Sequence, residues 1–69
     1  MKLSARNQIP ARVVAINSGE AIANVELDAN GVRLVASITV EAARELGLAA
    51  GSQVTAVIKA SDVIVGVPD

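Results

Sequence analysis

Two short clusters of hydrogen-bond donors, one near each end of the chain, are the residues best suited to chemistry in this sequence. The first is SARNQ at residues 4–8, and the second is KAS at residues 59–61. Together they supply hydroxyls, side-chain amides, a guanidinium and an ammonium, with almost no group that only accepts hydrogen bonds. Such a set is suited to holding an anion rather than to transforming one.

Catalytic chemistry has little support in the composition. The chain has no His and no Cys, so catalysis would need a Ser or Lys activated by a neighbour, or a pair of carboxylates. Glu41 and Glu45 are four residues apart beside Arg44, a spacing that describes a solvated helix face. We therefore expect a protein that is not an enzyme, with no cofactor and no directly coordinated metal.

Charge and composition also argue against several partners. The net charge is −1, from six Lys and Arg against seven Asp and Glu spread along the chain, and aromatic residues are absent. A site for nucleic acid usually combines a basic groove with aromatic stacking platforms, and neither is present. No apolar stretch approaches a signal sequence or a membrane span. The expected location is the cytoplasm.

The size and hydrophobicity of the chain point to an oligomer. A chain of 69 residues forms one domain with a thin core, yet 52% of its residues are hydrophobic. This excess over what one small core buries favours burial between subunits, as in obligate oligomers. The alternative is a compact monomer with a core of Ala and Val.

The apolar pattern predicts mostly β structure. Residues 9–16, with an early Pro10, favour a first strand, and residues 21–27 and 32–38 alternate between apolar and polar. The turn between the latter two contains Asn30-Gly31, a pair that readily takes positive φ. Thr39 is suited to cap a short helix that Gly47 would end. Alternation returns at residues 54–59 and 62–67 and predicts two more strands.

Three strands, a helix and two further strands are the element order of a five-stranded OB-like barrel, with the short helix between strands three and four. Four apolar side chains fall on strand faces that should be solvated. They are Ile22, Val35, Val57 and Ile64. Isolated apolar residues are common on surfaces, but four on four strands could form a patch for assembly.

Three segments resemble a known family. SARNQ at residues 4–8, ELGL at residues 45–48 and TAVIKASDV at residues 55–63 closely resemble a molbindin, the small Mop or TOBE-type molybdate-binding protein. The likeness spans essentially the whole chain as a single domain, residues 1–69. The same domain also occurs in molybdate-responsive regulators and importer ATPases, whereas this chain looks like the free-standing form.

The resemblance implies a strand-exchanged homo-oligomer, a hexamer built as a trimer of dimers, with oxyanions between subunits. Donors from one subunit would meet donors and backbone amides from a partner. The implied ligands are Ser4, Ala5, Arg6 and Asn7 from one cluster and Lys59, Ala60 and Ser61 from the other. A second site near the symmetry axis is assigned to the turn Gly19, Glu20 and Ala21, where the charge of Glu20 must point away from the anion.

The implied ligands, molybdate and tungstate, agree with a pocket made of donors. Both are tetrahedral dianions without a proton, so every oxygen accepts hydrogen bonds. Hydrogen phosphate carries a proton that would lack an acceptor. Sulfate must be excluded by size, because a cavity set for longer metal–oxygen bonds stretches its hydrogen bonds. We expect no discrimination against tungstate. We do not predict binding of the pterin in the family's older name, because no aromatic residue could stack on it.

The predicted function is therefore binding of molybdate and tungstate for intracellular storage and homeostasis. Two alternatives remain open. One is a structural oligomerisation module, in which Ser4 caps a turn, Arg6 pairs with Asp62 or a helix carboxylate, and Asn7 satisfies backbone groups before the first strand. The other is a regulatory partner domain without its own ligand.

Overall fold

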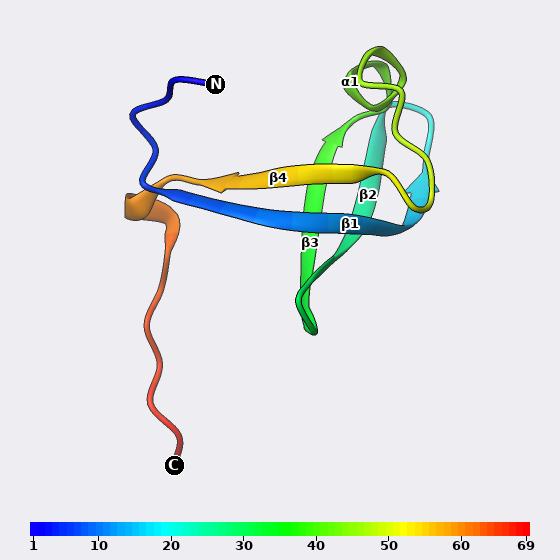
Figure 1. Ribbon diagram of the computed structural model, residues 1–69. Helices are drawn as coiled ribbons and strands as arrows, with labels where there is room; N and C mark the ends of the chain where they lie inside the picture. The colour runs from blue at the N-terminus through cyan, green and yellow to red at the C-terminus, as the bar shows by residue number, and fades with distance from the viewer.

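Four strands form one antiparallel sheet in the order β3-β2-β1-β4, and a short helix lies at one end of it (Figure 1). The computed structural model describes residues 1–69. Its elements are β1 Asn7–Ser18, β2 Ile22–Ala29, β3 Val32–Thr39, α1 Val40–Glu45, β4 Gln53–Ile58 and the 3-10 turn η1 Ala60–Asp62. The prediction of a mostly β chain with one short helix after the third strand is confirmed.

The local signals in the sequence set the boundaries of β2, β3 and α1. Asn30 and Gly31 have φ of 52° and 93°, which suits the tight hairpin between β2 and β3. Thr39 Oγ1 accepts a hydrogen bond from the Ala42 amide at 3.0 Å and so caps α1. At the other end Gly47 takes a φ of 63°, and its amide and that of the next residue donate back to helix carbonyls, as in a Schellman motif.

The long strand β1 serves two neighbours because it changes partner along its length. Its first half, from Asn7 to Arg12, pairs with β4, whereas its pairing with β2 begins at Arg12. Pro10 therefore lies where β1 has a neighbour on one side only, which a residue without an N–H tolerates. The register with β2 shifts between Val13 and Ala15, and this bulge bends the strand.

The core of the single chain is thin. Only six of the 69 residues are buried, and Val13, Val25 and Leu27 form its central cluster. The apolar residues predicted to lie on outward faces, Ile22 and Val35 among them, are exposed. Twelve large hydrophobic side chains are exposed in all. A chain that leaves so much apolar surface in water is poorly stabilised by itself.

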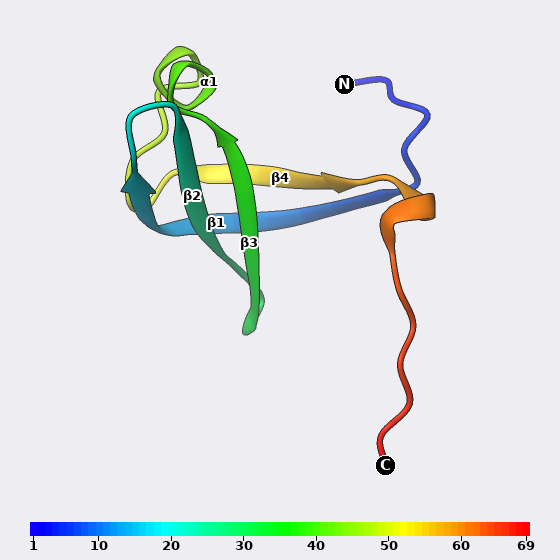
Figure 2. The ribbon, with the colours of Figure 1, turned by 180° about the vertical axis from the view of Figure 1, so that it is seen from behind.

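The predicted fifth strand is not formed in the single chain. After η1 the tail, residues 63–69, leaves the sheet as an extended segment without strand pairing (Figures 1 and 2). Alternation predicts which side chains share a face, but a strand also needs a partner for its backbone groups. The single chain therefore has an open sheet of four strands in place of the predicted five-stranded barrel, and β3 and β4 are both edges.

An apolar groove lies between the two edges. Its volume is about 440 Å³, and 13 of its 15 lining residues are hydrophobic. Leu34, Ala36 and Ile38 line it from β3, Val54, Ala56 and Ile58 line it from β4, and the core cluster Val13, Val25 and Leu27 also borders it. The open side of the sheet thus exposes the apolar surface that a fifth strand would cover.

Candidate functional site

The two donor clusters meet at one end of the molecule. The first residue of β1, Asn7, is paired with the last residue of β4, Ile58. Residues 4–6 of the N-terminal cluster precede this pair and the C-terminal cluster follows it, so the antiparallel register brings residues 4–7 beside residues 59–61. In Figures 1 and 2 both chain ends leave the β1/β4 pair at the end opposite α1.

The charged and hydroxyl groups of this end are free of partners within the chain. Ser4, Arg6, Lys59 and Ser61 are all exposed, and none of them makes a side-chain hydrogen bond. The single ion pair of the molecule joins Glu26 on β2 to Arg33 on β3. The structural roles considered above for Ser4 and Arg6, a turn cap and an ion pair, are therefore not realised in the chain.

Backbone amides add further donors beside these side chains. In η1 the amides of Asp62 and Val63 donate to the carbonyls of Lys59 and Ala60, at 2.9 and 3.3 Å. The amides of Ala60 and Ser61, like that of Ala5, make no hydrogen bond within the chain. Unpaired N–H groups beside a guanidinium and an ammonium form a surface complementary to an anion.

Asn7 differs from the other candidates. Its side chain is half-buried, and its Nδ2 donates to the Ile58 carbonyl oxygen at 3.1 Å. Asn7 thus satisfies a backbone group, but this group lies at the end of β4 and not before the first strand, where the sequence placed it. One N–H of this amide is consequently engaged before any anion arrives.

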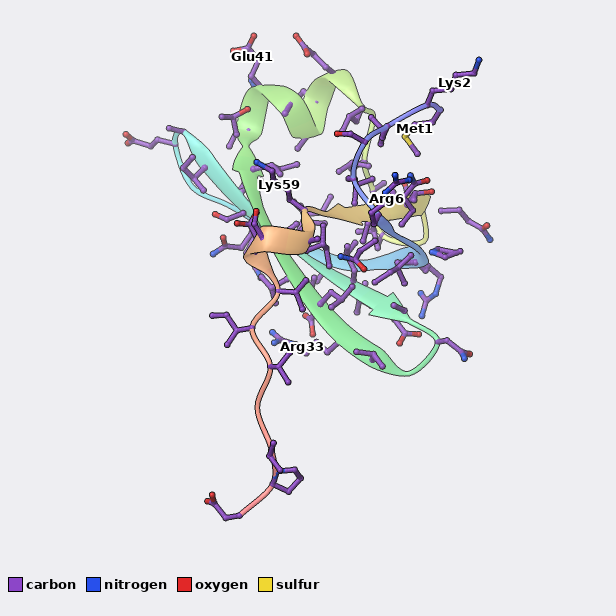
Figure 3. The ribbon with its side chains drawn as sticks, turned by 90° about the vertical axis from the view of Figure 1, so that its left-hand side faces the viewer. Met1, Lys2, Arg6, Arg33, Glu41 and Lys59 are labelled. Carbon is purple, nitrogen blue, oxygen red and sulfur yellow. The ribbon has the colours of Figure 1, made fainter.

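The two cationic side chains do not converge in one chain. Figure 3 shows Arg6 and Lys59 leaving this end of the sheet in different directions. In the conformation shown, the Arg6 and Lys59 of one chain are thus not directed at a common anion.

The turn assigned to the second site is only partly suited to an anion. The Gly19 amide donates to the Ile22 carbonyl at 2.8 Å, whereas the amides of Glu20 and Ala21 are unpaired. All three residues are exposed. The turn lies at the far end of β1 from residues 4–7, so the chain does not bring it together with the donor clusters.

The structure offers neither a metal site nor a membrane-spanning helix. No three His, Cys, Asp or Glu side chains gather closely enough to hold a metal ion. No helix has the length and apolar character to cross a membrane.

Sequence reasoning missed two features of this region. The Ile58 carbonyl anchors Asn7, and the groove between β3 and β4 takes its lining from both edges. Neither has a local signal, because both depend on the strand register and on which strands remain unpaired. Alternation over residues 54–58 identified the lining of β4, but not that it would border an open groove.

The chain matches known proteins over nearly its full length. The model of the TOBE domain family matches residues 3–65. A protein of Haemophilus influenzae named "Probable molybdenum-pterin-binding protein" is 43% identical over 68 residues, which cover 97% of this chain and 99% of the relative. A solved structure of a molybdate-binding protein from Sporomusa ovata is 40% identical with a TM-score of 0.91, covering 94% of this chain and 97% of that one. The structure of MopII from Clostridium pasteurianum is 36% identical with a TM-score of 0.88, covering 96% and 100%.

Proposed function

The chain belongs to the TOBE domain family, and on this premise we propose that it binds molybdate and stores it inside the cell. As a member of this family it is a binding protein and not an enzyme. One observation carries the proposal for this chain. Arg6 and Lys59, with the hydroxyls of Ser4 and Ser61, lie at one end of the sheet with no partner of their own.

The ligand is a fully deprotonated tetrahedral oxyanion, molybdate or tungstate. Each oxygen of such an anion accepts hydrogen bonds, and the groups gathered at this end are donors. The unpaired amides of Ala5, Ala60 and Ser61 add donors that carry no charge to compensate. Asp62, directly after the C-terminal cluster, is the nearest carboxylate in the sequence, and it must point away from the anion.

The binding site is completed between subunits of a homo-oligomer, for which we propose a hexamer built as a trimer of dimers. The divergence of Arg6 and Lys59 in Figure 3 supports a site that combines the N-terminal cluster of one chain with the C-terminal cluster of another. The turn Gly19, Glu20 and Ala21 is proposed as a second site, carried by the two amides that remain unpaired there.

Strand exchange explains how the chains associate. The tail carries Val63, Ile64, Val65 and Val67, all exposed, and the groove between β3 and β4 is apolar and open. We propose that the tail of one chain enters the groove of a second chain and completes its barrel as the fifth strand. This arrangement buries apolar surface from both and pairs backbone groups at an edge.

A structural oligomerisation module without a ligand is the competing function. The exposed apolar surface favours assembly under both hypotheses, so assembly alone does not separate them. Uptake of molybdate separates the two hypotheses, because only the storage hypothesis requires the donor clusters to bind an anion.

The test is native mass spectrometry and titration calorimetry with molybdate, tungstate and sulfate as matched dianions. The wild type should assemble and take up molybdate and tungstate but not sulfate. Arg6→Ala and Ser61→Ala should bind molybdate roughly tenfold or more weakly, because each removes a hydrogen bond to a charged group, and both should keep the assembly. Arg12→Ala, an exposed Arg on β1 away from the site, is the control. An assembly that ignores all three anions would support the structural module instead.

A further inference from the structure

Asn7 is the side chain that ties the two donor clusters together. Its Nδ2 hydrogen bond to the Ile58 carbonyl joins residues that are 51 positions apart. The five other side-chain hydrogen bonds of the molecule all join residues seven positions apart or fewer. No other side chain therefore makes a hydrogen bond that fixes the start of the chain against its end.

This bond lies at the end of the β1/β4 ladder, directly between the two clusters, so it affects the position of both. The pair Asn7 and Ile58 is the last of the β1/β4 register, and the terminal pair of a ladder is where strands fray. Arg6 directly precedes this pair and Lys59 directly follows it. If the pair opens, residues 4–6 and residues 59–61 are no longer held beside each other.

The burial of Asn7 also separates it from the anion-facing groups. Asn7 is half-buried, whereas Ser4, Arg6, Lys59 and Ser61 are exposed. One of the two N–H groups of the Asn7 amide is already engaged with a backbone carbonyl, so at most one remains for an anion.

We propose that Asn7 is a positioning residue of the oxyanion site, which holds residues 4–6 against residues 59–61 through the Ile58 carbonyl and does not itself bind the anion. This inference rests on the proposed function. It replaces direct donation by Asn7 with an indirect role, through the placement of η1 and of the N-terminal segment.

The test compares Asn7→Val with Asn24→Val in the full-length protein. Val suits a strand and removes the amide, and Asn24 is an exposed Asn on β2 whose side chain makes no hydrogen bond within the chain. Two quantities are measured for each variant. One is the affinity for molybdate, and the other is hydrogen exchange of the Asp62 and Val63 amides in the anion-free protein, since these amides hold η1 together.

Asn7→Val should bind molybdate about fivefold more weakly and should speed exchange of the two η1 amides before any anion is added. Asn24→Val should change neither. Weaker binding with unchanged exchange would make Asn7 a direct ligand and overturn the proposal. Unchanged binding in Asn7→Val, beside a wild type that binds molybdate, would overturn it as well.

Failure of the proposed function has a different signature. If the wild type takes up no molybdate in the same titration, the proposed function is refuted, and the positioning role of Asn7 is refuted with it. If Asn7→Val does not fold, Asn7→Ser is measured in the same way. Its hydroxyl is too short to span the same distance, so the same loss of affinity and faster exchange are expected.

Discussion

Replacing Val65 in the tail by Asp is the sharpest test of strand exchange. In the isolated chain this side chain is 85% exposed, so its replacement should leave the stability of a single chain almost unchanged. In the proposed assembly Val65 lies in the apolar groove of a second chain. The same substitution then places a carboxylate where no partner for it exists.

The loss of association free energy in Val65→Asp follows from the burial of the Val65 side chain that the substitution removes. Full burial of a Val side chain contributes about 1.5–3 kcal/mol. A loss of about 2 kcal/mol weakens association by roughly 30-fold for each tail, and the unpaired carboxylate adds to this. Because each tail would fill one groove, the effect repeats at every tail in the oligomer.

Gly66→Asp is the matched control. It adds the same charge one residue along, and a Cβ at Gly66 meets no atom within 4 Å. By the alternation of a strand, residue 66 faces away from the groove when residue 65 faces into it. Gly66→Asp should therefore retain most of the assembly.

Sedimentation velocity over a range of protein concentrations, together with thermal unfolding, measures both effects. Val65→Asp should dissociate at concentrations at which the wild type and Gly66→Asp remain assembled, and its unfolding temperature should fall. If all three proteins show the same mass and the same unfolding temperature, the tail does not occupy the groove, and the reasoning from exposed apolar surface is refuted.

Two further predictions concern the helix that closes one end of the sheet. Thr39→Ala removes the hydroxyl that accepts from the Ala42 amide, and should lower the free energy of unfolding by about 1 kcal/mol in a denaturant titration, whereas Thr39→Ser should restore most of it. Gly47→Ala forces a side chain into a φ of 63° and should cost roughly 1 kcal/mol. An unchanged unfolding midpoint in Gly47→Ala would show that the Schellman ending contributes nothing to the stability of α1.

The strands and turns that depend on local pattern were predictable from the sequence. Asn30 and Gly31 adopt the positive φ values that their types favour, and Thr39 caps the helix as its position indicates. Strand β1 is longer than predicted, Asn7–Ser18 in place of residues 9–16. The polar residues at both ends obscure its length, because hydrogen bonding to β2 and β4 extends it beyond the apolar segment.

The parts that depend on partners were not predictable. The alternation of residues 62–67 has the period of a strand, but alternation does not reveal that the single chain pairs this segment with no other strand. The donor clusters could be identified by type, yet their meeting depends on the register of Asn7 with Ile58. Asn7 was assigned to the anion by resemblance, and only the geometry reveals its bond to the Ile58 carbonyl.

The open groove has a consequence for folding kinetics. If the tail of one chain enters the groove of another, as proposed above, folding is completed in a second-order step, and refolding should contain a phase that slows on dilution. Until that step the edges β3 and β4 are both bare, and bare edges can pair with the wrong strand. The rate of synthesis relative to the rate of encounter then decides how many chains reach the assembled state.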